Sequence, residues 1–369
     1  MSDRLHETFI DLCRIPSPSC NERAVSLYIR QRAAAYGLHV EEDDAGAVLG
    51  SDTGNLLVQT QGVGEPLFLS AHMDTVPPTL VDGQVPVVVD GDRVHTGGRS
   101  ILGGDDKAGI AVALEMLHEA VHHPDTMRPL DVIFTIQEEQ GARGAAHFDA
   151  QRIRARQGFN LDGDTPVGTA IHQAPFKARF TIDVTGRAAH AAVNPEDGIN
   201  AIKAIAAIAA DLPTGKLDAN SIVNLGQIEG GGVINVVPAH ARLIGEARSL
   251  LSGGLGALHQ QIESTAMTEG QAAGASVAFH WEQLYAGYCV STDTGIAQLF
   301  RDACAREGLA ANFTSTYGGG DANPYNNKSM TCVVFGLGMT AIHTPDEAIL
   351  LSDLSQAARI LRHACTSRL

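Results

Sequence analysis

The sequence has few aromatic residues and no long apolar run, and each absence excludes a class of protein. Aromatic residues make up only 5% of the 369 residues, too few for a stacking platform that binds single-stranded nucleic acid. The richest apolar stretch, 201–210, is about half of the roughly 20 residues that a membrane helix needs, and it includes Lys203. We therefore expect neither a nucleic-acid partner nor a membrane span.

Basic residues are also scarce. Lysine and arginine number 26 against 42 aspartates and glutamates, which gives a net charge of −16. This balance opposes binding to polyanions and suits the binding of cations. The six cysteines form no C-x-x-C pair, and residues 1–12 carry acids where a signal peptide is basic and then apolar. We therefore expect a cytoplasmic protein with free thiols.

Polar side chains follow several predicted strands of this chain. Because open α/β sheets bind their ligands beyond the carboxyl ends of the strands, these side chains are expected to converge on one crevice. They are His72 and Asp74 after the strand 67–71, Glu138 and Glu139 after 131–136, Asp162 after 158–161, Asp105 and Asp106 before the helix 107–121, and His343 late in the chain.

The spacing of these residues predicts the domain organisation. His72, Asp105 and Glu138 follow one another at about 33 residues, which suits crossover units of a parallel sheet. A gap of about 180 residues then separates Asp162 from His343, too long for one connection. The gap contains strand-like segments at 178–184, 222–228 and 233–248, and a helix at 196–210.

We therefore predict an α/β fold with a mostly parallel sheet flanked by helices, formed by residues 1–172 and 286–369. Residues 173–285 are predicted to form an inserted, smaller α+β lid and dimerisation domain.

Imidazole and carboxylate groups without thiolates suit catalytic Zn²⁺, or Mn²⁺ and Co²⁺ where these metals are supplied. Asp105 can bridge two ions, and Asp74 can accept the ring N–H of His72. Of the adjacent Glu138 and Glu139, one can bind metal while the other acts as general base. Two metals that activate a bridging water are suited to amide hydrolysis.

Each of these elements alone is more often structural. Taken alone, His72 is more often a structural histidine whose ring nitrogens are hydrogen-bonded. The two glutamates alone usually belong to a solvent-exposed loop, and Asp105 and Asp106 alone are typical of acids that cap a helix. Their joint occurrence favours the metal site.

Short motifs spread over almost the whole chain support this interpretation. They are HMDTV at 72–76, GGDDKAG at 103–109, EEQGARGA at 138–145, LDGD at 161–164, GRAAHAAVNPEDGINAI at 186–202, GGGDAN at 318–323 and IHTPDE at 342–347. In this order they resemble the di-zinc exopeptidase family of peptidase T, glutamate carboxypeptidase and acetylornithine deacetylase, and most of all its peptidase T-like branch.

The resemblance implies a role for each matching residue. It implies two Zn²⁺ ions per subunit, a bridging role for Asp105, Glu138 as general base and Asp74 as the orienting acid. It implies that His190 donates to the substrate carbonyl from the partner subunit of a homodimer. The implied zinc ligands are His72, Asp105, Glu139, Asp162 and His343, and the implied substrate contacts are Arg248, Asn235, Gly319 and Gly320.

The resemblance also implies an exopeptidase for short peptides, most of all a tripeptide aminopeptidase. A carboxypeptidase or an N-acyl-amino-acid deacylase with the same site is the alternative, and a non-catalytic, metal-dependent peptide-binding protein is an alternative of another class. The motifs GGDDKAG and GGGDAN replace the commoner GADDKAG and GGSDAN, which leaves substrate preference near Gly320 open. Members of the family often have a cis peptide between the two motif aspartates, so we expect one at Asp105–Asp106.

Overall fold

The computed structural model describes residues 2–366, which form two compact units. The first unit contains the chain up to Gln173 and from Cys289 onward, and the second contains Ala174–Tyr288. These boundaries lie within a few residues of the domain boundaries expected from the sequence.

The first unit is built on a mixed sheet whose described strands follow the order β1-β2-β6-β3-β7-β16-β8-β14, with β15 beside β8. The central strands β6, β3, β7 and β16 run parallel. β3 and β6 are buried along their whole length, as expected for a parallel sheet covered on both faces. The strands are β1 (Val40–Glu42), β2 (Leu56–Gln59), β3 (Leu67–His72), β6 (Leu130–Thr135), β7 (Gln157–Gly163), β8 (Thr169–Ala174), β14 (Tyr288–Cys289), β15 (Asn312–Ser315) and β16 (Thr331–Gly336).

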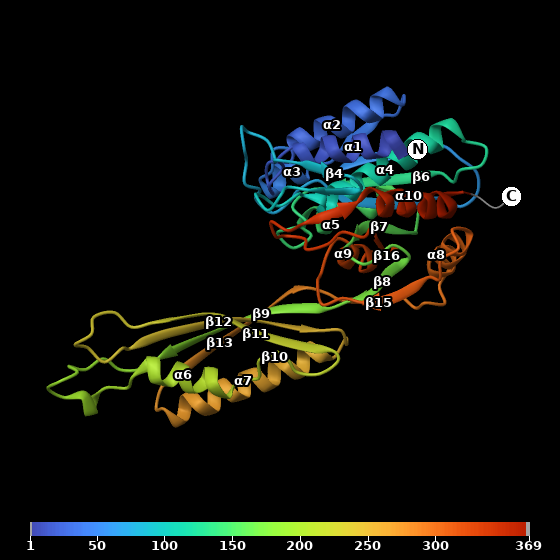
Figure 1. Cartoon of the computed structure of the whole chain (residues 1–369). Coiled ribbons are helices and arrows are strands. Elements are labelled where there is room, and N and C mark those ends of the chain that lie inside the picture. Colours follow the sequence, from blue (N-terminus) through green and yellow to red (C-terminus); the bar gives the residue numbers. More distant parts are fainter. Residues whose placement is uncertain (1, 367–369) are drawn as a thin grey trace. The chain divides into compact units, whose positions relative to one another are not determined.

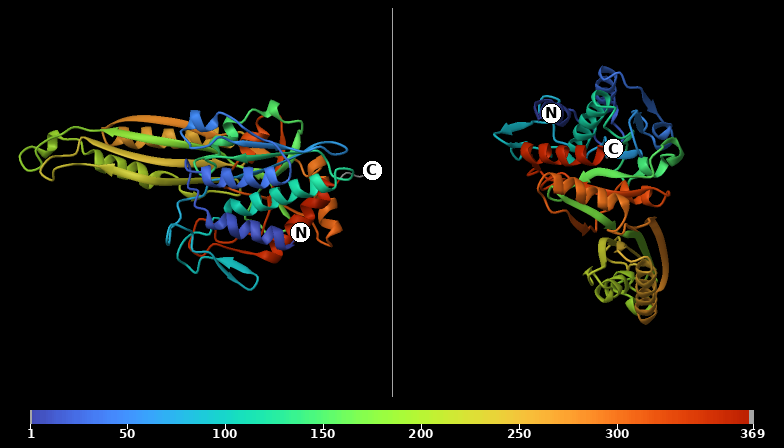
Figure 2. Two further views of the ribbon diagram at one scale, coloured as in Figure 1. Left: turned by 90° about the horizontal axis from the view of Figure 1, so that it is seen from above. Right: turned by 90° about the vertical axis from the view of Figure 1, so that its right-hand side faces the viewer.

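Helices flank this sheet, which confirms the predicted fold class (Figures 1 and 2). The longest, α4, begins at Gly104 and packs against β3 and β7. The helices of the unit are α1 (Ser2–Arg14), α2 (Arg23–Ala35), α3 (Ala45–Leu49), α4 (Gly104–His122), α5 (Arg143–His147), α8 (Gly295–Arg306), α9 (Ala322–Asn326) and α10 (Leu351–Cys365). A small antiparallel sheet joins β4 (Val88–Asp90), β5 (Arg93–His95) and β17 (Ala348–Leu350).

Helix α1 was missed by the sequence analysis, although its signal is present. Leu5, Phe9, Leu12 and Cys13 recur at helical spacing and are all buried. The acidic residues of this segment argue against a signal peptide, but the apolar residues between them are those that predict the helix.

The second unit is an antiparallel sheet in the order β10-β11-β12-β9-β13. Helices α6 and α7 pack side by side on one face of it (Figures 1 and 2). Alternate residues of β9, such as Phe180 and Ile182, meet Ile205 and Ile262 of the helices in one apolar core. The elements are β9 (Phe176–Thr185), α6 (Ala201–Asp211), β10 (Gly215–Lys216), β11 (Ser221–Gly230), β12 (His240–Ser249), α7 (Gly254–Ala272) and β13 (Ser276–Tyr285).

Two boundaries predicted in this unit are wrong. The strand expected from Val233 begins only at His240, because Pro238 cannot donate to a ladder and Ile234 is fully exposed. The helix expected from Glu196 begins at Ala201, where the Asn200 side chain accepts a hydrogen bond from the Lys203 amide at 3.1 Å and caps it.

Within residues 2–366, none of the helices combines the length and the apolar character that crossing a bilayer requires.

Candidate active site

Two predicted ligands lie at the carboxyl ends of adjacent parallel strands. His72 is the last residue of β3, and Asp162 is near the end of β7, which pairs with β3. His72 Nε2 lies 3.5 Å from Asp162 Oδ1. The hydrogen bonds of the sheet therefore fix the relative position of these two side chains.

The start of α4, where the backbone of Asp105 and Asp106 is not helical, brings Asp105 to His72. Gly103 adopts a left-handed conformation with φ of 71°, and the expected cis peptide between Asp105 and Asp106 is confirmed. Asp105 Oδ1 lies 2.9 Å from His72 Nε2. Asp106 points back into the fold, where its carboxylate accepts hydrogen bonds from the His72 amide at 3.1 Å and the Gly109 amide at 3.0 Å.

The Asp74 carboxylate holds the two glutamates that follow β6. It accepts hydrogen bonds from the backbone amides of Glu138 at 2.9 Å and Glu139 at 3.2 Å, and from Ser19 Oγ at 2.7 Å. The His72 ring Nδ1 lies 2.9 Å from the backbone carbonyl oxygen of Asp74 and 3.5 Å from its Oδ1. Asp74 therefore positions the glutamates as well as the histidine.

His343 joins these residues from the far end of the chain. Its Nε2 lies 3.1 Å from Asp105 Oδ2 and 3.0 Å from Glu139 Oε1. Each oxygen of Asp105 thus faces a different imidazole, Oδ1 toward His72 and Oδ2 toward His343. The structure brings all five predicted ligands together: His72, Asp105, Glu139, Asp162 and His343.

The electrostatics reflect four carboxylates crowded around two imidazoles. Burial raises the pKa of Asp162 to about 7, and the nearby charge of Asp105 adds to this shift. Burial also raises the pKa of Glu138 well above its ordinary value, reinforced by Asp162. Hydrogen bonds to Asp105 and Glu139 raise the pKa of His343 to about 10.

Burial alone would lower the pKa of His72, but the carboxylates of Asp162 and Asp105 outweigh it and hold this pKa well above the usual range. Strongly shifted pKa values gathered in one cluster are typical of functional sites.

Gly320 forms one wall of the cluster. A Cβ atom on Gly320 would lie 3.1 Å from Glu138 Oε1 and 3.4 Å from Asp162 Oδ2. Only a residue without a side chain brings its backbone this close to both carboxylates without crowding them. The other predicted glycine, Gly319, is exposed.

Four residues that hold the site together were missed as site residues. Glu347 and Asp321 stand inside the motifs IHTPDE and GGGDAN, and the Asp321 carboxylate accepts a hydrogen bond from the Thr135 hydroxyl at the end of β6. Ser19 and Glu22, which bond Asp74 and the Gln137 amide, carry no local signal because their partners are far along the chain. Long-range contacts of this kind come only from the fold.

His190 and Asn235 belong to the second unit and lie on neighbouring loops. His190 and Val236 form an isolated antiparallel β-bridge, and the Ala191 amide donates a hydrogen bond to the Asn235 carbonyl at 3.0 Å. Both His190 and Asn235 are exposed. The structure therefore brings these two predicted residues together.

Arg248 lies near the other end of the same sheet. It pairs with Lys177, close to the point where the chain enters the unit, whereas His240 at the start of β12 pairs with Thr185 next to the His190 loop. Eight residues of extended strand span about 26 Å. Arg248 Nε donates to Glu246 at 2.8 Å. Within the unit, Arg248 and His190 are thus not brought together.

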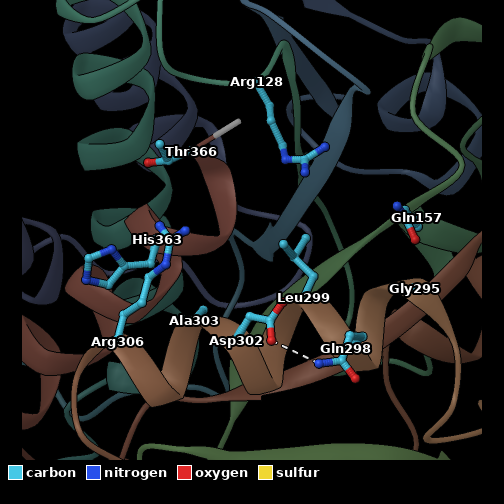
Figure 3. Close-up of a pocket in the computed structure, with 10 residues that line it drawn as sticks. All are labelled: Arg128, Gln157, Gly295, Gln298, Leu299, Asp302, Ala303, Arg306, His363 and Thr366. Atoms are coloured by element: carbon cyan, nitrogen blue, oxygen red, sulfur yellow. Dashed lines mark hydrogen bonds between the residues drawn. The ribbon is translucent and has the colours of Figure 1, made fainter. Parts of the chain in front are cut away.

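A separate pocket of about 260 Å³ lies in the first unit, along α8 and α10. Figure 3 shows Gln298 donating to Asp302, a bond of 2.9 Å, on one wall of this pocket. None of the predicted site residues lines it. The pocket is therefore no part of the candidate active site.

The fold and the cluster define a class of enzymes that hydrolyse peptide bonds. The chain belongs to the peptidase family M20/M25/M40, whose model matches residues 68–367. The resemblance to this family, inferred from the motifs, is confirmed.

Two solved structures are similar to this chain over nearly its full length. Aminopeptidase PepT from Bacillus cereus superposes with a TM-score of 0.91 at 28% identity, covering 99% of this chain and 98% of that one. A tripeptidase from Staphylococcus aureus gives a TM-score of 0.92 at 27% identity with the same coverage. The Bacillus subtilis protein YqjE is 31% identical over 360 residues, covering 97% of this chain and 96% of its own length.

Proposed function

We propose that the chain is a two-metal exopeptidase for short peptides, and specifically an aminopeptidase that acts on tripeptides. The observation that carries this proposal is the Asp105 carboxylate, whose two oxygens face His72 and His343 at 2.9 and 3.1 Å. One carboxylate shared between two histidine-containing groups suits a pair of cations. The aminopeptidase and the tripeptidase that resemble the chain support the substrate class.

The donor set fits zinc. Two imidazoles and three carboxylates without thiolate are ligands of catalytic Zn²⁺, and they also suit Mn²⁺ or Co²⁺. His72, Asp105 and Asp162 would hold one ion, and Asp105, Glu139 and His343 the other. Glu139 Oε1 and His343 Nε2 lie 3.0 Å apart, close enough for both atoms to serve one cation.

Glu138 is the proposed general base. When bound, the two ions polarise the scissile carbonyl and make water more acidic. Glu138 takes the proton of the attacking water and passes it to the leaving amine, and Asp74 holds Glu138 in place through its backbone amide. His190 donates a hydrogen bond to the oxyanion. Arg248 pairs with the terminal carboxylate of the peptide.

The choice of substrate is tested with the zinc-loaded protein and three compounds. We expect Ala-Ala-Ala to be hydrolysed at least about a hundredfold faster than its N-blocked form or an acyl amino acid. Neither of these two compounds has the free amino group that an aminopeptidase recognises, so the protein groups that bind it would be left without a hydrogen-bond partner. Amino acid release, followed by chromatography, is the measurement. Equal cleavage of the blocked peptide or of the acyl compound would favour the carboxypeptidase or the deacylase. Inertness toward all three would favour the peptide-binding alternative.

A homodimer completes the proposed site. An extended tripeptide spans only about 10 Å, so it cannot contact both His190 and Arg248 of one chain when about 26 Å of strand separates them. The partner subunit then supplies one of the two residues, and the family resemblance assigns this role to His190. Exposed apolar side chains beside the His190 loop support such an interface, since Val193 is 75% and Val233 68% exposed.

Complementation between two inactive variants tests this arrangement. We expect Glu138→Gln and His190→Ala to be inactive alone, and co-assembled chains to recover up to about a quarter of wild-type activity, because half of the dimers are mixed and each has one intact site. The matched control is Glu138→Gln co-assembled with a chain that carries both Glu138→Gln and His190→Ala, since no site in these dimers contains Glu138. If mixed dimers form but stay inactive, His190 does not act across the interface.

The proposed location is the cytoplasm. All six cysteines are free thiols, and four of them are buried. Free thiols are the usual state in a reducing compartment.

A further inference from the structure

A buried glutamate outside the proposed ligand set binds the loop that carries Asp105. The Glu347 side chain comes from the turn before β17 and is only 2% exposed. Its Oε2 accepts hydrogen bonds from the amides of Leu102 at 2.7 Å and Gly103 at 2.9 Å, and its Oε1 accepts one from Asp105 at 3.1 Å. Three amides thus converge on one carboxylate, an arrangement that fixes the loop strongly.

Gly104 makes room for this carboxylate. A Cβ atom on Gly104 would lie 3.1 Å from Glu347 Oε1, closer than side chains normally approach. The glycine and the glutamate therefore form one tightly fitted unit, although about 240 residues separate them in the chain.

The turn that provides Glu347 also carries His343. It is closed by mutual backbone hydrogen bonds between Thr340 and Ala348, at 3.0 and 3.1 Å. His343 has a left-handed backbone with φ of 63°, and its side chain is 46% exposed, so core packing does little to place it. The contact of Glu347 with the Asp105 loop therefore sets the distance between His343 and Asp105.

The other ligand group is held by different contacts. His72 and Asp162 stand on paired strands, and Asp106 ties the aspartate pair to the His72 amide. None of these contacts involves Glu347, so its loss should affect the two metal positions unequally.

We propose that Glu347 is a positioning residue that builds the metal position formed by Asp105, Glu139 and His343. This inference rests on the proposed two-metal function. Glu347 is outside the proposed ligand set, and it acts by joining the His343 turn to the Asp105 loop.

The test is metal titration of Glu347→Gln. The amide keeps one acceptor oxygen and places an NH₂ group where an oxygen faced an N–H donor. We expect the affinity for one of the two Co²⁺ equivalents to fall about 10- to 100-fold, as when outer-shell partners of metal ligands are removed, with the other changed less than about threefold. Competition with a chromophoric chelator and the visible spectrum of bound Co²⁺ measure both steps without an activity assay.

Asp131→Asn is the matched control. Asp131 is also fully buried and accepts hydrogen bonds from the amides of Arg154 at 2.7 Å and Ala155 at 2.9 Å, but it lies near the start of β6, away from the glutamates that follow this strand. We expect this variant to lose stability and to bind both equivalents normally. Equal loss of Co²⁺ affinity in both variants would mean general destabilisation and would overturn the proposal.

A second variant covers the case in which Glu347→Gln does not fold. Gly104→Ala displaces Glu347 Oε1 by a few tenths of an ångström and should weaken the same equivalent in the same direction. If wild-type protein binds two Co²⁺ ions and both folded variants match it, the positioning role is wrong. If wild-type protein binds no pair of ions, the proposed function itself fails.

Discussion

Replacing Glu138 by glutamine is expected to lower kcat by about two to four orders of magnitude while both metal equivalents remain bound. Glu138 lies beside Asp162 at the Gly320 wall of the cluster and, among the described residues, makes no ion pair with His72 or His343. A glutamine has nearly the same shape but cannot accept the proton of the attacking water at neutral pH. The loss should therefore lie in the chemical step.

Initial rates on Ala-Ala-Ala and metal content of the same sample measure this prediction together. Because the variant keeps the backbone amide that bonds Asp74 at 2.9 Å, the glutamate loop should hold its position. KM should change far less than kcat, since the lost interaction belongs to the transition state.

Glu41→Gln is the control for the chemical change itself. Glu41 is a surface residue that pairs with Arg152 at 3.0 Å in the same unit, and exposed ion pairs contribute little. It should have wild-type activity. Turnover of Glu138→Gln close to that of Glu41→Gln would remove Glu138 from the mechanism.

Much of the fold was predictable because a few strong local patterns carry it. The apolar run 131–136 corresponds to β6, and the polar residues after it lie at the sheet edge where a parallel fold places ligands. The long gap between Asp162 and His343 indicated the inserted unit, which the structure divides at Ala174 and Tyr288. The pattern of apolar residues and the spacing of the polar ones along the chain were sufficient to predict these features.

Two errors arose where local sequence does not decide structure. The apolar residues around Ile234 are typical of a strand, but they lie on an exposed loop. The motif IHTPDE contains Glu347 but does not indicate its role, because this role comes from three amides far away in the chain. A buried hydrogen-bond acceptor of this kind is recognised only when its donors are in place.

Replacing Asp105 by asparagine is the second large effect that we expect. An asparagine side chain has one oxygen in place of two and carries no charge. It therefore cannot bind one cation on the His72 side and a second cation on the His343 side. Bound metal should fall from two ions to at most one per chain. Activity should fall by at least about a thousandfold, because the chemistry depends on both ions acting on one substrate.

Asp106→Asn is the informative comparison, because Asp105 and Asp106 are neighbouring residues of the same type and the sequence alone does not tell their roles apart. The Asp106 carboxylate accepts hydrogen bonds from the amides of His72 and Gly109, so its replacement should lower thermal stability and leave two ions bound. Metal analysis by atomic emission, with thermal unfolding of the same samples, separates the two cases. His72, Asp106 and Asp162 also lie close enough together to hold an ion. Metal loss in Asp106→Asn with retention in Asp105→Asn would therefore transfer the ligand role to Asp106 and leave the bridge between His72 and His343 without a function.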